Sequence, residues 1–185
     1  RQKARILSEA LPFIRAFHAS TLIIRFGGGA MADRARKEGF ARDVALLRLV
    51  GMNPIIVHGG GWRIDDLLRT MGIAIRRHRG VRVTDEATLN VIEMVLGEIN
   101  QELVGLINRF GAKAVGLSGQ DGRFIRARRL KLPCDVESGE PPDVGLVGEV
   151  EGIDPDVIHL LVSRGFIPVI MPIGVGADGT AYHIN

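Results

Sequence analysis

Short apolar runs alternate along this chain with longer segments in which apolar residues recur every three or four positions. The short runs are typical of buried strands, and the longer spacing is typical of amphipathic helices. Strands are predicted at 21–26, 54–58, 113–117 and 167–171, and helices at 3–17, 34–50, 62–71, 86–109 and 155–163. This alternation predicts an α/β fold, a three-layer sandwich around a mainly parallel sheet with right-handed crossovers.

Capping residues and turn residues refine the predicted boundaries. Asp33 is expected to cap the second helix, and Thr84 or Asp85 the long fourth one. Pro12 predicts a kink in the first helix. The remaining segments are predicted as a strand or hairpin at 73–83, antiparallel strands at 123–130 and 145–152 around a polar loop at 133–143, and a hairpin turn at 177–180 leading into 181–185.

Two glycine runs follow directly after the first two predicted strands. Gly27, Gly28 and Gly29 come after 21–26, and Gly59, Gly60 and Gly61 come after 54–58. Glycines let backbone N–H groups close on phosphate oxygens, and the start of the following helix adds its positive dipole end. Either run alone could be a tight turn that needs small residues. Two of them in successive strand–helix units predict a phosphate gripped from two sides, which favours phosphoryl transfer.

Charge and composition narrow the class of protein. The net charge is +3, with basic residues concentrated at 76–79 and 123–131. These stretches lack interleaved aromatic residues, so a solvated surface or attraction of anionic substrates is favoured over nucleic-acid binding. The lone Cys134 cannot form an internal disulfide, which favours a reducing cytoplasm. No apolar run is long enough to predict a membrane span or the core of a signal peptide.

Several motifs follow one another along the chain in a definite order. They are Gly27-Gly28, Val57-His58-Gly59-Gly60-Gly61, Gly80-Val81-Arg82-Val83-Thr84-Asp85, Gly165-Phe166-Ile167-Pro168-Val169 and Ile173-Gly174-Val175, together with Phe40-Ala41-Arg42-Asp43 and 93–97. This ordered set resembles the amino acid kinase family, and within it the acetylglutamate kinases, from about Ala4 to Asn185. The resemblance implies transfer of the γ-phosphoryl group of ATP, with Mg²⁺, to the side-chain carboxylate of N-acetyl-L-glutamate in arginine biosynthesis.

The same resemblance implies roles for particular residues. Backbone donors to the phosphoryl group and the substrate carboxylate would come from Gly27, Gly28, Gly59 and Gly60, beside Gly61. Arg82 matches the arginine that grips the α-carboxylate of the substrate, a task that suits a forked guanidinium. Asn185 matches the second asparagine of the family's Asn-x-Asn segment. No metal ligands are predicted within this chain itself.

Several positions depart from the family pattern. The lysine that stabilises the transferring phosphoryl group is replaced by Arg25, and the first asparagine of Asn-x-Asn by His183. Gly29 stands where asparagine is usual, and Trp62 begins the segment where Pro-Gln is usual. We predict Gly28, Gly60 and Arg25 as catalytic residues, although Arg25 could also be a snorkelling or degenerate residue.

The resemblance also implies a domain organisation. Residues 1–19 would form a helix that links dimers into a hexameric ring, and residues 20–185 the amino-acid-substrate lobe. The catalytic aspartate and the nucleotide lobe would follow Asn185, so the chain by itself is expected to bind ATP poorly and to transfer little phosphate. It is expected to form homo-oligomers and to bind neither nucleic acid nor membrane.

Two other functions stay open at this stage. The chain could be a non-catalytic arginine-sensing domain, as found ahead of the acetyltransferase domain in N-acetylglutamate synthase, or a degenerate inactive paralogue. Two single residues also have a plainer interpretation. Arg82 could form a surface salt bridge with a neighbouring acid, and His58 is expected to form structural hydrogen bonds rather than to bind metal, because no second ligand lies at metal spacing.

Overall fold

A four-stranded parallel sheet forms the centre of the computed structural model, which describes residues 2–134 and 140–184. Its strands are β1 (Thr21–Phe26), β2 (Asn53–His58), β8 (Ile167–Met171) and β5 (Ala114–Ser118), in that spatial order. These are the four strands that the apolar runs predict. The parallel pairing means that their carboxyl ends lie at one edge of the sheet.

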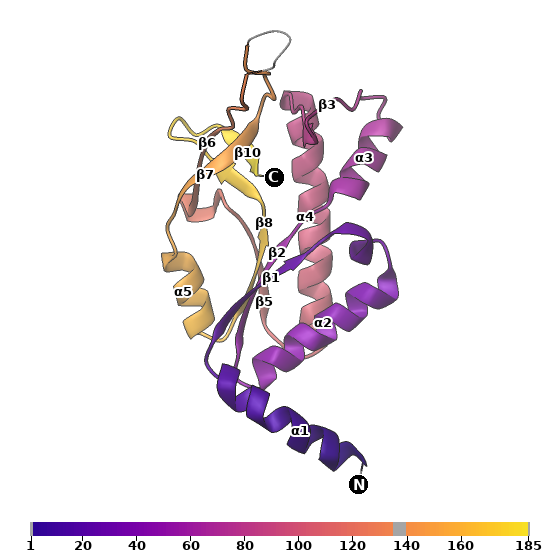
Figure 1. Ribbon diagram of the computed structural model, residues 1–185, viewed down its shortest axis with the longest axis vertical. Coiled ribbons are helices and arrows are strands. Elements are labelled where there is room, and N and C mark those ends of the chain that lie inside the picture. The colour runs from indigo at the N-terminus through magenta and orange to yellow at the C-terminus, as the bar shows by residue number, and fades with distance from the viewer. Residues whose placement is uncertain (1, 135–139, 185) are drawn as a thin grey trace.

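Helices cover both faces of this sheet (Figure 1). One face carries α2 (Arg34–Leu49), α3 (Gly61–Thr70) and α4 (Glu86–Arg109), and the other carries α5 (Asp156–Ser163). The main core lies on the first face, where α4 contributes a row of fully buried side chains: Ile92, Leu96, Leu103 and Ile107. The predicted three-layer α/β sandwich is therefore confirmed.

Side-chain caps set the starts of two helices. The Asp33 carboxylate accepts a hydrogen bond from the Arg36 N–H at 2.8 Å, and that of Asp85 accepts one from the Thr88 N–H at 2.8 Å. Of the two candidates for capping the fourth helix, the cap is therefore Asp85. Each cap satisfies one of the backbone donors that a helix start leaves without a partner.

A small closed barrel stands at the carboxyl end of the sheet. It consists of β10 (Ala181–Ile184), β7 (Val147–Ile153), β6 (Ile125–Arg129) and β9 (Ile173–Val175). The antiparallel β6–β7 pair and the β9–β10 hairpin agree with the sequence pattern. The pattern does not predict the parallel β10–β7 and β6–β9 pairings that close the barrel, because they join segments far apart in the sequence.

A two-stranded hairpin follows α3. It pairs β3 (Arg77–His78) with β4 (Val81–Arg82), and its turn places Arg79 and Gly80 at positive φ angles of 48° and 85°. Arg77 lies directly opposite Arg82 in this pairing. Short 3-10 turns, η1 (Gly28–Met31) and η2 (Asp121–Arg123), complete the described elements.

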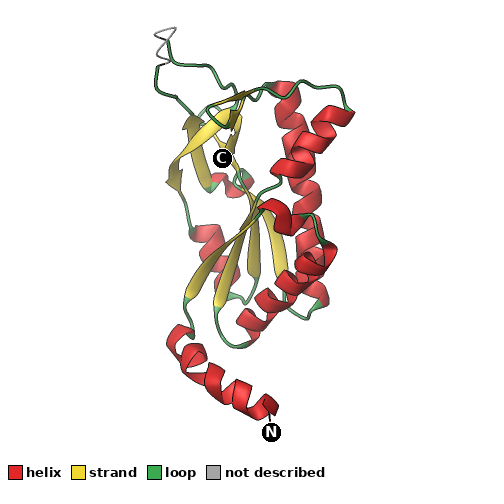
Figure 2. Ribbon diagram, turned by 45° about the vertical axis from the view of Figure 1, so that its right-hand side comes forward, coloured by secondary structure: helices red, strands yellow, loops and turns green. Residues whose placement is uncertain are grey.

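The amino-terminal helix α1 (Gln2–Phe17) extends away from the body of the molecule in both views (Figures 1 and 2). Its apolar side chains Ile6, Leu11, Phe13 and Phe17 are all exposed, Phe13 to 66%. In the described part of the chain, no helix is both long enough and apolar enough to cross a membrane.

Candidate functional site

A cavity of about 520 Å³ opens at the carboxyl ends of β1 and β2, between α3, the β3–β4 hairpin and the barrel. Its volume falls within the range of small-molecule pockets, roughly 300–1,000 Å³. The polar and glycine lining consists of Arg25, Gly27, Gly28, His58, Gly59, Gly60, Gly61, Arg77, Arg82 and His183. The cavity thus brings together every residue of the sequence-predicted site except Asn185, which lies outside the described residues.

The two glycine runs meet because β1 and β2 are parallel and in register. Phe26 lies opposite His58, so both turns begin at the same level of the sheet. The Gly59 N–H donates to the Phe26 carbonyl at 3.0 Å, and a Cβ on Gly27 would lie 3.9 Å from the Gly59 nitrogen. The Gly59 N–H, which the resemblance implies as a donor to the ligand, thus already has a partner in this structure and ties the two turns together.

Two other glycines of the lining are constrained for different reasons, Gly28 by its backbone conformation and Gly60 by its packing against α4. Gly28 has a φ of +66°, which L side chains rarely adopt, and a Cβ on Gly60 would lie 2.9 Å from Ile99 Cδ1. Gly60 caps α3, whose first N–H groups, beginning at Gly61, have no acceptor within the helix. These donors and the positive end of the helix dipole favour an anion at this end of the cavity.

Arg82 is a buried arginine whose Nη2 makes hydrogen bonds within the chain and whose Nε does not. Its side chain is 6% exposed, and its Nη2 donates to Asp65 Oδ1 at 2.5 Å and to the Gly61 carbonyl at 3.3 Å. Its Nε is buried and has no hydrogen-bond partner in the part of the chain that the structure describes. A buried donor without a partner costs about 1–3 kcal/mol, so an acceptor that reached this N–H would recover that cost.

Asp65, which the sequence does not single out, holds two arginines at once. It accepts from Arg77 Nη2 at 2.8 Å as well as from Arg82. Burial of this carboxyl acts to raise its pKa, but the hydrogen bonds and charges of the two arginines outweigh burial and lower the pKa below its ordinary value. The plainer interpretation of Arg82, an ion pair with a nearby acid, is thus partly right, although the pair is largely buried.

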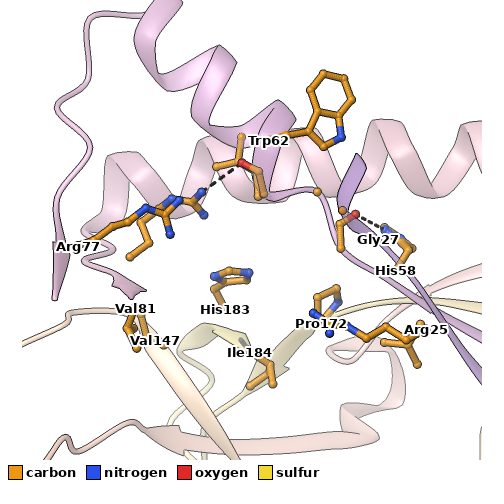
Figure 3. Close-up of a pocket in the computed structure, with 17 residues that line it drawn as sticks. Arg25, Gly27, His58, Trp62, Arg77, Val81, Val147, Pro172, His183 and Ile184 are labelled. Atoms are coloured by element: carbon orange, nitrogen blue, oxygen red, sulfur yellow. Dashed lines mark hydrogen bonds between the residues drawn. The ribbon is translucent and has the colours of Figure 1, made fainter. Parts of the chain in front are cut away.

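His183 and Ile184 line the cavity from the barrel, opposite Trp62 on the α3 side (Figure 3). Burial of the His183 ring, helped by the positive charge of Arg82, lowers its pKa from 6.5 to about 4. His183 is therefore neutral at neutral pH. It adds no charge to the cavity and can donate or accept one hydrogen bond at each ring nitrogen according to its tautomer.

Arg25 stands at the end of β1, on the side of the cavity that Pro172 lines (Figure 3). It is exposed, and no carboxylate of the described residues lies within ion-pair distance of it. Together with Arg77 and Arg82 it gives the cavity three guanidinium groups, while the described residues contribute no carboxylate to the lining. The site is therefore electrostatically suited to a dianion or to two anionic groups.

His58 is almost fully buried beneath the second glycine run. Its Nδ1 lies 3.2 Å from the Gly59 carbonyl oxygen, and its Nε2 lies 3.0 Å from Asn100 Nδ2. Burial lowers the pKa of the ring, although the bond to Gly59 acts in the opposite direction. These contacts agree with the expected structural role, and Asn100 is a second residue that the sequence alone did not indicate.

Metal ligands do not gather at this cavity. Within residues 2–134 and 140–184, no group of three or more His, Cys, Asp or Glu side chains is placed to hold a metal ion.

Comparison with known proteins identifies the class. Residues 20–185 match the sequence profile of the amino acid kinase family. The chain belongs to that family, and it is similar to acetylglutamate kinases. It is 58% identical to the acetylglutamate kinase of Chromobacterium violaceum over all 185 residues, and 54% identical to that of Polynucleobacter asymbioticus over 184 residues. It spans 63% and 61% of the lengths of these relatives.

Solved structures show the same fold at low sequence identity. N-acetylglutamate synthase from Neisseria gonorrhoeae matches with a TM-score of 0.81 and 23% identity, over 97% of this chain and 39% of that one. An isopentenyl phosphate kinase matches with a TM-score of 0.58 and 17% identity, over 89% of this chain and 63% of that one. These likenesses support the amino acid kinase-like architecture and nothing narrower.

Proposed function

We propose that this chain provides the amino-acid-substrate lobe of an acetylglutamate kinase, which binds N-acetyl-L-glutamate for phosphorylation in arginine biosynthesis. The observation that carries the proposal is the buried Nε of Arg82, which has no partner and belongs to a residue lining a cavity rich in cations. N-acetyl-L-glutamate has two carboxylates, which suits three guanidinium groups and a lining without acids. The similarity to acetylglutamate kinases along the whole chain agrees with this choice.

Each part of the cavity has a role in this proposal. Arg82 would bind the α-carboxylate through its Nε–H, which has no partner among the described residues. Val81, Val147 and Ile184 provide apolar surface for the methylene groups and the acetyl methyl. His183 contributes a neutral donor or acceptor for the amide of the substrate. Together these contacts would direct the side-chain carboxylate toward the glycine turns.

Transfer would need little covalent chemistry from the protein. One oxygen of the ionised side-chain carboxylate attacks the γ-phosphorus of ATP, the bond from that phosphorus to the β–γ bridging oxygen breaks, and ADP leaves with the electron pair. The backbone donors at Gly28 and Gly60 and the charge of Arg25 would stabilise the transferring group. ATP, with its Mg²⁺, is the phosphoryl donor in this proposal.

A non-catalytic, arginine-sensing role or an inactive paralogue is the second candidate. The observation behind it is that Arg25 and His183, two of the departures from the family pattern, both line the cavity. The planar guanidinium of Arg25 does not reproduce the compact charge of the lysine that the family usually has there.

Isothermal titration of the chain with N-acetyl-L-glutamate, and separately with L-arginine, tests the proposal. We expect N-acetyl-L-glutamate to bind, and Arg82→Lys, which keeps the charge but removes Nε, to weaken binding by about tenfold or more. Arg128→Gln is the matched control, because Arg128 also pairs with an acid, Glu149, at 2.9 Å but lies outside the cavity. Absence of binding, or equal affinity in Arg82→Lys, would overturn the proposal, and binding of L-arginine alone would favour the sensing role.

Two further features belong to the proposal. The chain would form a dimer, and the exposed apolar side chains of α1 would link dimers into a hexamer. A cytoplasmic location accords with the single, exposed and unpaired Cys134.

A further inference from the structure

A buried asparagine on α4 reaches both the central sheet and the ring of His58. Asn100 is 4% exposed, and its Nδ2 lies 2.8 Å from the Val169 carbonyl oxygen and 3.0 Å from His58 Nε2. A carbonyl oxygen can only accept, so the group that faces Val169 must be the amide NH₂. Since that nitrogen carries two hydrogens, its second one is available to His58, and Nε2 must accept it.

The other side of the ring leads to the same assignment independently. His58 Nδ1 lies 3.2 Å from the Gly59 carbonyl oxygen, which again can only accept, so Nδ1 must carry the hydrogen. Both ends of the imidazole therefore require a neutral ring with its hydrogen on Nδ1. Reversal of either contact would place two donors or two acceptors face to face in a buried site.

The neighbouring strand leaves room for this asparagine. Gly116 of β5 lies opposite Val169 of β8 in the sheet. A Cβ on Gly116 would stand 1.9 Å from Asn100 Oδ1. Any larger residue at 116 would thus displace the Asn100 amide. The position of this one side chain therefore depends on three strands: β2 with His58, β5 with Gly116 and β8 with Val169.

The consequence reaches the cavity through a single peptide unit. The Gly59 carbonyl and the Gly60 N–H are opposite ends of one planar trans peptide, so fixing the first fixes the direction of the second. The Gly59 N–H is held by Phe26 at 3.0 Å. No described residue accepts a hydrogen bond from the Gly60 N–H, and Gly60 lines the cavity.

We propose that Asn100 and His58 are positioning residues that hold the Gly59–Gly60 peptide, so that the Gly60 amide is presented as a donor to an anionic group of the ligand. Neither side chain needs to touch the ligand, because both act through the peptide. The inference rests on the proposed function only in taking N-acetyl-L-glutamate as that ligand. The state of the ring is independent of any ligand.

Nitrogen NMR of the ¹⁵N-histidine-labelled chain tests the first part without ligand. We expect the His58 ring to be neutral with its proton on Nδ1. In Asn100→Asp, which keeps the shape but replaces the donor by an acceptor, we expect the proton to move to Nε2 or the ring to become doubly protonated. In Gly116→Ala we expect the Nε2 signal to shift as the amide is displaced. A wild-type ring protonated on Nε2, or an unchanged ring in Asn100→Asp, would overturn the inference.

Titration with N-acetyl-L-glutamate tests the second part. We expect Asn100→Asp and Gly116→Ala each to weaken binding by about tenfold, with a shifted Gly60 amide resonance. Asn108→Ala is the matched control, because Asn108 also bonds from α4 to β5, with its Oδ1 accepting from the Ala114 N–H at 2.6 Å, yet lies away from the cavity. It should lower stability but leave affinity and the ring unchanged.

The outcomes separate the two proposals. If the wild-type chain does not bind N-acetyl-L-glutamate, the proposed function fails. The positioning role is then still decided by the protonation of the His58 ring and by the shift of the Gly60 amide resonance in the variants. If the wild type binds and Asn100→Asp binds equally well, or if the Gly60 resonance does not respond, the positioning role fails and the proposed function stands.

Discussion

Asp65 accepts a hydrogen bond of 2.5 Å from Nη2 of Arg82, while the buried Nε of the same guanidinium has no partner among the described residues. A fully satisfied buried arginine would serve stability alone. A half-satisfied one retains desolvated donor capacity that a carboxylate can use, since charge-assisted bonds in a dry site are stronger than those in water. Asp65 thus fixes the position of the Arg82 guanidinium, while the Nε–H of that group stays available to an anion.

Removing the charge of Asp65 should loosen this arrangement. In Asp65→Asn the side chain keeps its shape, but Arg77 and Arg82 lose the carboxylate between them. We expect affinity for N-acetyl-L-glutamate to fall by about 1 kcal/mol and the free energy of unfolding by about 1–2 kcal/mol. Calorimetric titration and urea unfolding measure the two effects.

Asp66→Asn provides the control for that variant. Asp66 is the next residue of α3 and pairs with Arg63 at 3.1 Å, but it is more exposed than Asp65, and Arg63 does not line the cavity. Affinity should stay within about twofold, since exposed pairs contribute little. A loss of affinity as large as that in Asp65→Asn would show that the effect comes from the general charge of α3.

The sequence predicts much of this fold because local physics decides it. The run at 167–171 is a strand buried between two layers, as its apolar residues predict, whereas the strand at 21–26 lies at the edge of the sheet and is largely exposed, with Ile23 74% exposed. Asp33 and Asp85 lie within three residues of the N–H groups that they cap in α2 and α4. The glycine runs are also local signals, since they follow strand ends directly. Parallel pairing then brings them to the same cavity, as expected.

The remaining features depend on contacts between distant segments. Asp65 faces Arg82 only after α3 and the hairpin have packed, and Asn100 reaches His58 across a separation of 42 residues. On its own helix each looks like an ordinary polar residue. Closure of the barrel by β10 and β7 is likewise a pairing that no short window of sequence contains.

His183 should make stability depend on pH. Its pKa is 6.5 in the unfolded chain and about 4 in the folded one, so above pH 6.5 the ring is neutral in both states. As the pH falls from 6.5 toward 4, the unfolded chain binds a proton that the folded chain excludes, and stability is lost. Between pH 7.5 and pH 5 we expect His183 to contribute a loss of about 2 kcal/mol.

Urea unfolding of the wild type and of His183→Asn at both pH values measures that contribution. The pKa of His58 is also lowered, so His58 likewise makes the folded chain less stable as the pH falls. It is present both in the wild type and in His183→Asn, so its effect is common to the two. The difference between the two pH dependences therefore isolates His183. Identical dependences would mean that the ring is protonated as easily in the folded chain as in the unfolded one.

Two adjacent glycines should respond differently to alanine. A Cβ on Gly60 would lie 2.9 Å from Ile99 Cδ1 and 3.1 Å from Leu96 Cδ2, so Gly60→Ala should lower the free energy of unfolding by about 1–3 kcal/mol. A Cβ on Gly61 meets nothing within 4 Å, and alanine favours the helix, so Gly61→Ala should be neutral or stabilise by up to about 1 kcal/mol. Thermal unfolding compares the two variants, and equal losses would contradict the packing at Gly60.

Arg25 should affect the phosphate end of the cavity and not the amino-acid end. It is exposed and has no carboxylate partner among the described residues, so Arg25→Gln should change stability by no more than about 0.5 kcal/mol. We expect this variant to keep its affinity for N-acetyl-L-glutamate. Its affinity for inorganic phosphate, measured in the presence of saturating N-acetyl-L-glutamate, should fall by about tenfold. Arg128→Gln should alter neither, and a phosphate affinity unchanged by Arg25→Gln would remove Arg25 from the site.

Self-association should depend on the apolar face of α1. Phe13 is 66% exposed and Phe17 47% exposed on a helix that extends from the body, and burial of such surface against another copy stabilises by about 25 cal/mol per Å². We expect sedimentation velocity to show oligomers for the wild type and smaller species for Phe13→Asp. Leu49→Asp, on α2 and 82% exposed, is the control that adds the same charge elsewhere. A monomeric wild type, or equal dissociation by both substitutions, would show that α1 does not provide the contact.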